Sequence, residues 1–164
     1  MIRVVVDDLA FLSVDAVLRA ADASLDPVTP SGVRLDRQAG AAFAAQRRIA
    51  SPLEAGAAVV TGAGELVAPL VVHVVIQDAD ASPGRETVRR ALVSAWQRAG
   101  EWQLGTLAAP PIGAGAGLLA VEEAALLMAE TFPDGREFPR ELAIVVERED
   151  DRVTVEAALR RRQG

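Results

Sequence analysis

The chain has 164 residues, enough for one domain that buries a sizeable core without covalent crosslinks. Half of the residues (51%) are hydrophobic, which excludes an intrinsically disordered chain. The net charge of −6 disfavours direct binding to a nucleic-acid backbone. The chain has no cysteine, which excludes disulfides and thiolate metal sites. We therefore expect a single globular domain over residues 1–164.

The first residues run from an apolar stretch, 1–6, directly into Asp7 and Asp8. This pattern is typical of a first strand, and it lacks the basic head and long apolar body of a signal peptide. No apolar run approaches the roughly 18 residues that a membrane span requires. We therefore expect a cytoplasmic protein with no membrane partner.

Short apolar runs alternate with helical patterns along the chain. In chain order the patterns predict a strand at Ile2–Val6, a helix at Leu35–Ala50, strands at Ala57–Val60 and Leu70–Ile76, a helix at Thr87–Ala99, a strand at Leu104–Ala109, a helix at Val121–Thr131, a strand at Leu142–Val146 and a helix at Arg152–Arg162. Val14–Ala21 fits either state, and Pro27–Gly32 and Asp78–Gly84 read as surface loops. The alternation predicts a three-layer α/β domain with helices on both faces of the sheet.

The stretch Pro110–Gly117 alternates glycine with alanine and leads into the helix predicted at Val121–Thr131. Gly113, Gly115 and Gly117 leave the backbone N–H groups almost bare, so the loop can curl around an anion. A tight connection that needs glycine for packing explains the same pattern. The position of the loop after a strand favours a phosphate-bearing ligand, because ligands of open α/β sheets bind there.

Other sites with recognisable patterns are excluded. The glycine spacing does not match the dinucleotide fingerprint, and no lysine lies near the loop, as a P-loop requires. No serine stands in a G-x-S-x-G elbow. His73, the one histidine, lies in an apolar run and is predicted to be a hydrogen-bonded core residue. We therefore expect no metal and no cofactor.

Asp7 and Asp8 form an acidic pair at the end of the first predicted strand. A solvated turn accounts for them. So does a carboxylate that accepts hydrogen bonds from an amino group or a sugar hydroxyl, as nucleotide sites require. Both interpretations remain open on these residues alone.

Taken together, these segments resemble the macro domain family, the ADP-ribose-binding module, over nearly the whole chain. Residues 6–10 (VDDLA) resemble its Gly-Asp-Ile-Thr turn, with Asp8 in the place of the adenine-reading aspartate. Residues 14–22 (VDAVLRAAD) resemble its Val-Asp-Ala-Ile-Val-Asn-Ala-Ala-Asn strand, residues 54–61 (EAGAAVVT) a strand start, and residues 71–73 (VVH) its Val-Ile-His strand. Residues 112–117 (IGAGAG) resemble the loop that wraps the phosphates and the distal ribose.

The resemblance implies a three-layer α/β/α fold around a mixed, mostly parallel sheet, with a strand at 14–22. It implies ADP-ribose or a related nucleotide as ligand, and an ADP-ribosylated macromolecule as a further partner. The ligand-binding residues that it implies are Asp8, Leu9, Gly113, Ala114, Gly115, Ala116, Gly117 and Leu118.

The chain departs from the family pattern on the other side of the site. Arg19 and Asp22 replace the two asparagines, and residues 26–32 (DPVTPSG) replace the run of glycines that forms one wall of the distal ribose pocket. The acidic residue that hydrolytic members place next falls on Gly32, or on Arg34 in a shifted register. Asp22 is the remaining candidate for a catalytic base.

Three functions are therefore compatible with the sequence. The favoured one is the binding of ADP-ribose or a related nucleotide diphosphate, with weak or no hydrolase activity. A second is a hydrolase that removes ADP-ribose from an adduct, or phosphate from ADP-ribose 1″-phosphate, with Asp22 as base. The third is a degenerate macro fold that binds no nucleotide and acts as an interaction or structural protein.

Overall fold

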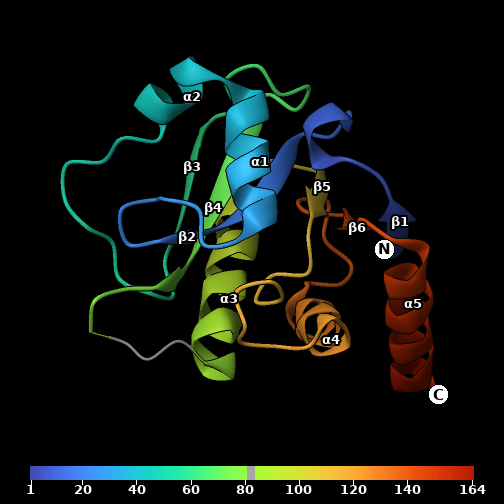
Figure 1. The fold of residues 1–164 in the computed structure, drawn as a ribbon. Helices are drawn as coiled ribbons and strands as arrows, with labels where there is room; N and C mark the ends of the chain where they lie inside the picture. The colour runs from blue at the N-terminus through green and yellow to red at the C-terminus, as the bar shows by residue number, and fades with distance from the viewer. Residues whose placement is uncertain (81–83) are drawn as a thin grey trace.

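The computed structural model describes residues 1–80 and 84–164. Within these residues, six strands form one sheet in the order β1–β6–β5–β2–β4–β3 (Figure 1). The strands are β1 (Ile2–Val6), β2 (Ala16–Asp22), β3 (Ala58–Gly62), β4 (Leu70–Gln77), β5 (Thr106–Ala109) and β6 (Glu141–Val146). β3 is antiparallel to β4, and the other neighbouring pairs of the described sheet are parallel. The prediction of a mixed, mostly parallel sheet is confirmed.

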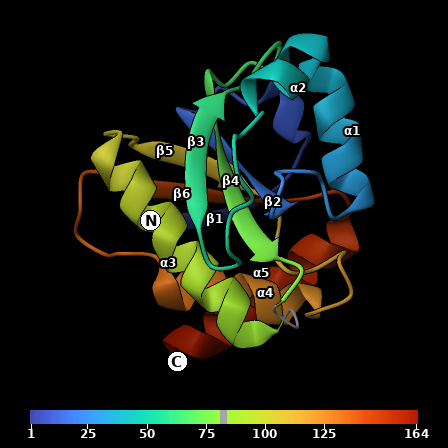
Figure 2. The same ribbon diagram turned by 90° about the vertical axis from the view of Figure 1, so that its left-hand side faces the viewer.

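Helices cover both faces of this sheet, as Figure 2 shows for α1 and α2 on one side and α3 on the other. The helices are α1 (Pro30–Ala39), α2 (Ala41–Gln46), α3 (Arg85–Glu101), α4 (Val121–Thr131) and α5 (Glu149–Gln163), with a short 3-10 helix, η1 (Leu9–Phe11). The three-layer α/β/α architecture is therefore confirmed. None of the helices in the described residues combines the length and the apolar character that a membrane crossing requires.

The strand β2 lies inside the sheet and divides the core into two parts. Side chains alternate along a strand, so its successive residues face opposite layers. Leu18 packs in the larger core cluster with residues of α3 and α4, such as Leu92 and Leu127. Val17 packs in the second cluster with Leu35 of α1 and with α2. A strand buried on both faces lacks an apolar–polar alternation, which is why the sequence pattern of 14–21 is ambiguous.

The predicted helix Leu35–Ala50 and the predicted loop Pro27–Gly32 are both wrong in their bounds. The helical segment divides at Gly40, whose φ of +85° favours glycine, into α1 and α2. α1 begins earlier than expected, because the Thr29 hydroxyl caps the helix and Pro30 occupies its first position. The predicted loop Asp78–Gly84 lies partly outside the described residues.

Candidate functional site

A cleft of about 860 Å³ opens at the carboxyl ends of β1, β5 and β6. One wall is α1, and the other consists of the segments that follow the three strands. The lining comprises Asp7, Asp8, Leu9, Thr29, Pro30, Ser31, Arg34, Leu35, Gln38, Pro110, Pro111, Ala114, Gly115, Leu119, Val121, Val145, Val146, Glu147 and Asp151. Its position is the one that ligands of open α/β sheets occupy.

Asp8 lies at one end of the cleft, and its carboxylate is held by two partners. Oδ1 accepts a hydrogen bond from the backbone N–H of Ala10 at 3.0 Å and so caps η1. Oδ2 accepts from the side-chain amide of Gln38, on α1, at 3.3 Å. The first bond fixes the carboxylate at the end of β1, and the second joins it to the opposite wall.

The glycine loop lies at the other end of the cleft. Gly113, Gly115 and Gly117 have φ values of +102°, +79° and +79°, a region that side-chain-bearing residues rarely adopt. The loop is closed on itself, because Ala114 N–H donates to the carbonyl of Pro111 at 3.1 Å. The glycines are therefore required by the backbone path, whether or not a ligand is present.

Thr29 brings the wall formed by α1 against this loop. A Cβ atom placed on Gly115 would lie 3.5 Å from Cγ2 of Thr29, an ordinary van der Waals distance. The Thr29 hydroxyl accepts from the N–H of Gly32 at 3.0 Å and lies 3.1 Å from the hydroxyl of Ser31. The two walls of the cleft therefore lie close to each other at Thr29 and Gly115.

The charges along the cleft are mostly negative. Asp7, Asp8, Glu147 and Asp151 line it, and among the described lining residues Arg34 is the cation. The guanidinium of Arg34, on α1, pairs with Glu147, which follows β6. Both side chains are more than half exposed, so this ion pair crosses between the two walls in contact with solvent.

Asp22, the predicted base, does not line the cleft. Its Oδ1 accepts hydrogen bonds from the N–H groups of Ser24 at 2.8 Å and Asp26 at 3.0 Å. Its own N–H donates to the carbonyl of Asp26 at 3.0 Å. The carboxylate thus stabilises the turn that follows β2.

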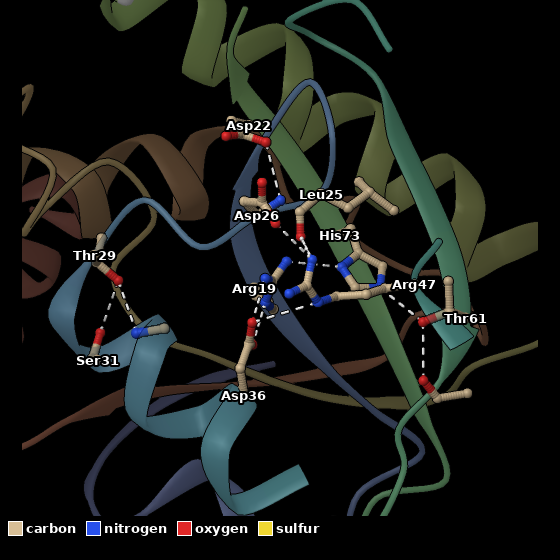
Figure 3. A network of polar contacts seen from close by, with 12 residues as sticks. Arg19, Asp22, Leu25, Asp26, Thr29, Ser31, Asp36, Arg47, Thr61 and His73 are labelled. Atoms are coloured by element: carbon tan, nitrogen blue, oxygen red, sulfur yellow. Dashed lines mark hydrogen bonds and ion pairs between the residues drawn. The ribbon is translucent and has the colours of Figure 1, made fainter. Parts of the chain in front are cut away.

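Arg19, which the sequence resemblance places at the first family asparagine, is buried, and Figure 3 shows its guanidinium directed toward Asp36 and His73. Its Nε and Nη2 donate to the two carboxylate oxygens of Asp36, on α1, at 2.6 and 2.7 Å. Arg47 extends the network, since its Nε lies 3.6 Å from Oδ2 of Asp36. Its Nη1 donates to Asp26 at 2.9 Å and to the carbonyl of Leu25 at 3.0 Å. A buried guanidinium requires such partners, because an unpaired buried charge is strongly destabilising.

His73 continues the same network from β4. Nη1 of Arg19 donates to Nδ1 of His73 at 3.1 Å, so Nδ1 carries no proton and Nε2 donates to the Thr61 hydroxyl at 2.7 Å. Burial, together with the positive charges of Arg19 and Arg47, lowers the pKa of His73 to about 3. The prediction of a hydrogen-bonded core histidine agrees with this geometry.

The structure brings together some of the predicted ligand-binding residues. Asp8, Leu9, Ala114 and Gly115 line the cleft, and Gly113 lines a cavity of about 30 Å³ beside it. Ala116, Gly117 and Leu118 line neither space. Ala116 and Leu118 instead pack against the larger core cluster.

The contribution of α1 to the cleft was not predicted from the sequence. The helical positions i, i+3, i+4 and i+7 that line it are Ser31, Arg34, Leu35 and Gln38. The sequence does contain a signal for the start of this helix, since Thr29 followed by Pro30 is a pattern that begins helices. With the helix started there, these four residues fall on one face.

Comparison with known proteins agrees with this architecture. The model of the macro domain family matches residues 20–128, which is more than half of the chain. No curated protein sequence matches the chain at a significant level. The chain belongs to the macro domain family.

Solved structures of macrodomains are similar to the chain in fold. The Trypanosoma brucei macrodomain in complex with ADP-ribose has a TM-score of 0.81 at 18% identity, over 96% of this chain and 68% of that one. The Oceanobacillus iheyensis macrodomain with MES bound has a TM-score of 0.81 at 17% identity, over 98% and 90%. The same macrodomain with ADP has a TM-score of 0.70 at 14% identity, over 98% and 90%.

Proposed function

We propose that this chain binds ADP-ribose or a related nucleotide diphosphate in the cleft, with weak or no hydrolase activity. The observation that carries the proposal is that the Asp8 carboxylate and the glycine loop at Gly115 open onto the same space. Membership of the macro domain family supports it, as do the similar macrodomains with ADP-ribose or ADP.

The chemistry of the cleft suits a nucleotide. Leu9, Leu35 and Val145 supply apolar surface for a base, and the Asp8 carboxylate can accept a hydrogen bond from an exocyclic amino group. The loop around Gly115 permits close backbone approach to a phosphate. The volume of about 860 Å³ falls within the usual range for small-molecule sites, about 300–1,000 Å³.

The position of Asp22 supports the proposal of weak or absent hydrolysis. A general base must reach the proton that it removes, directly or through one water. The Asp22 carboxylate lies outside the lining of the cleft and accepts two backbone hydrogen bonds within its own turn. Gly32 and Arg34, at the position of the usual acidic residue, supply no carboxylate in its place.

Isothermal titration calorimetry with ADP-ribose at millimolar concentration tests the binding. We expect saturable heat with one site per chain. No heat, and no shift of the melting temperature, would contradict the proposal and favour a degenerate fold that acts through other interactions.

An assay on an ADP-ribosylated protein, and on ADP-ribose 1″-phosphate, tests the hydrolase alternative. We expect no turnover by the wild type beyond that of Asp22→Ala. Turnover that the Asp22→Ala variant loses, while it still binds ADP-ribose, would instead assign an enzyme with Asp22 as its base.

A further inference from the structure

We propose that a hollow at the end of α2, separate from the cleft, is a binding site for a phosphate group. The hollow has a volume of about 290 Å³ and shares no lining residue with the cleft. Its lining comes from the turn after β2, with Ser24 and Asp26, and from Ala44 and residues 47–52 at the end of α2 and beyond it. The inference does not depend on the nucleotide binding proposed above.

Two neighbouring arginines give the hollow a positive charge. Arg47 and Arg48 line it together with one acidic residue, Asp26. The chain as a whole has a net charge of −6, so this hollow differs in sign from the protein around it. Exposed charges more than about 8 Å away are largely screened at physiological salt, so the local guanidinium groups determine the attraction of an anion.

Arg47 is fixed in place and keeps a free donor. Its Nη1 donates to the carbonyl of Leu25 and to Oδ1 of Asp26, both drawn in Figure 3. Leu25 is buried with a φ of +64°, a region that leucine rarely adopts, so the turn holds its carbonyl toward Arg47 at the expense of backbone strain. Nη2 of Arg47 donates no hydrogen bond to the described residues. A guanidinium held in this way loses little side-chain entropy when it binds an anion.

Arg48 supplies a second guanidinium, and this one has no partner. Its side chain is exposed and forms neither a hydrogen bond nor an ion pair with the described residues. The planar fork of donors in a guanidinium matches two oxygens of a phosphate. Arg48 is therefore available to a ligand in the hollow.

The backbone and the hydroxyl groups of the hollow add further donors. The N–H groups of residues 49–51 donate no hydrogen bond within the described part of the chain. The hydroxyls of Ser24 and Ser51 are also without a partner among these residues. The one carboxylate of the lining, that of Asp26, is bound to Arg47. An excess of free donors suits a phosphate group, which presents three strong acceptor oxygens.

Titration of the ¹⁵N-labelled chain with inorganic phosphate at low ionic strength, followed by amide chemical shifts, tests the site. We expect saturable shifts for residues 49–51, with a dissociation constant on the order of 1 mM. Arg48→Gln should weaken this binding at least fivefold, and the variant keeps the fold because the side chain is exposed. Arg161→Gln is the matched control, since it removes an exposed arginine on α5 outside the hollow and should leave the affinity unchanged.

Two further titrations distinguish the source of the phosphate and the two sites. Phosphoserine carries the same group on an organic molecule: tighter binding than inorganic phosphate would assign the hollow to a phosphorylated ligand, and weaker binding would assign it to the free ion. ADP-ribose at a concentration that saturates the cleft should leave the shifts caused by inorganic phosphate at residues 49–51 unchanged. A failure of ADP-ribose to bind would overturn the proposed function and leave the phosphate site standing.

Three results would overturn the phosphate site. The first is the absence of saturable shifts at residues 49–51 in the wild type. The second is an equal loss of affinity in Arg48→Gln and Arg161→Gln, which would attribute the binding to net charge alone. The third is binding of acetate at residues 49–51 as tight as that of inorganic phosphate, which would show that the hollow does not select phosphate.

Discussion

Arg19, in the middle of β2, donates two parallel hydrogen bonds to Asp36, on α1, and thereby ties the wall of the cleft to the sheet. The same helix carries Arg34 and Gln38 into the cleft. The sequence resemblance places Arg19 where the family has an asparagine, and in this chain its side chain is buried and pairs with α1. The Arg19–Asp36 pair therefore contributes to the position of the helix that forms the wall.

Asp36→Asn should destabilise the protein by about 3 kcal/mol, because it leaves the buried Arg19 without a counter-charge. Urea unfolding followed by circular dichroism measures this loss. The matched control is Glu147→Gln, which removes an exposed ion pair and should cost less than about 1 kcal/mol. An equal loss in the free energy of unfolding in the two variants would show that the buried Arg19–Asp36 pair stabilises the fold no more than the exposed pair does.

His73 should remain neutral in the folded protein down to about pH 4, because burial lowers its pKa to about 3. The unfolded chain takes up this proton near pH 6.5, so the free energy of unfolding falls as the pH drops below that value. Between pH 7 and pH 5 the wild type should lose about 2 kcal/mol more than His73→Gln. Urea unfolding of both proteins at the two pH values measures this difference. Equal losses of unfolding free energy in the wild type and in His73→Gln would contradict the lowered pKa of His73.

Gly115→Glu should weaken the binding of ADP-ribose more than tenfold, because the new side chain enters the cleft and adds a negative charge. Gly135→Glu is the control, since Gly135 also has a positive φ (+70° against +79°) and lies outside the cleft. Both variants carry a similar backbone strain, so calorimetry separates the loss of the site from the loss of stability. Unchanged affinity in Gly115→Glu would show that the loop does not contact the ligand.

Glu147→Gln should raise the affinity for ADP-ribose about fivefold, which corresponds to about 1 kcal/mol for one negative charge removed from the lining of the cleft. It also releases Arg34 from its ion pair. Arg34→Gln should lower the affinity by a similar factor.

Calorimetry at low ionic strength measures both changes, since salt screens charges that are exposed to solvent. Glu101→Gln removes an exposed carboxylate on α3, away from the cleft, and should leave the affinity unchanged. An effect of the same size in Glu101→Gln would attribute the change to net charge alone.

Local patterns in the sequence were sufficient to predict the fold class. They also pointed to Asp8 and the glycine loop, which lie at the two ends of the candidate site. Continuous apolar runs predicted β1 and β4 closely, and the helix at Val121–Thr131 has the predicted bounds. The positive φ values of the glycine loop follow from residues that are adjacent in the chain. The position of Asp8 after β1 places it at the carboxyl edge of the sheet.

The groups that face Asp8 and the glycine loop across the cleft follow from the packing of distant segments. The partner of Arg34 is Glu147, 113 residues away, and Thr29 lies close to Gly115, in a segment that shares no sequence pattern with it. The alternation along β2 places Arg19 and Leu18 on opposite faces, but only the packing of α1 supplies Asp36 as a counter-charge. The helices and strands could be predicted from the sequence, because periodicity and backbone preferences are local. The width and the charge of the cleft could not, because they depend on how distant elements pack.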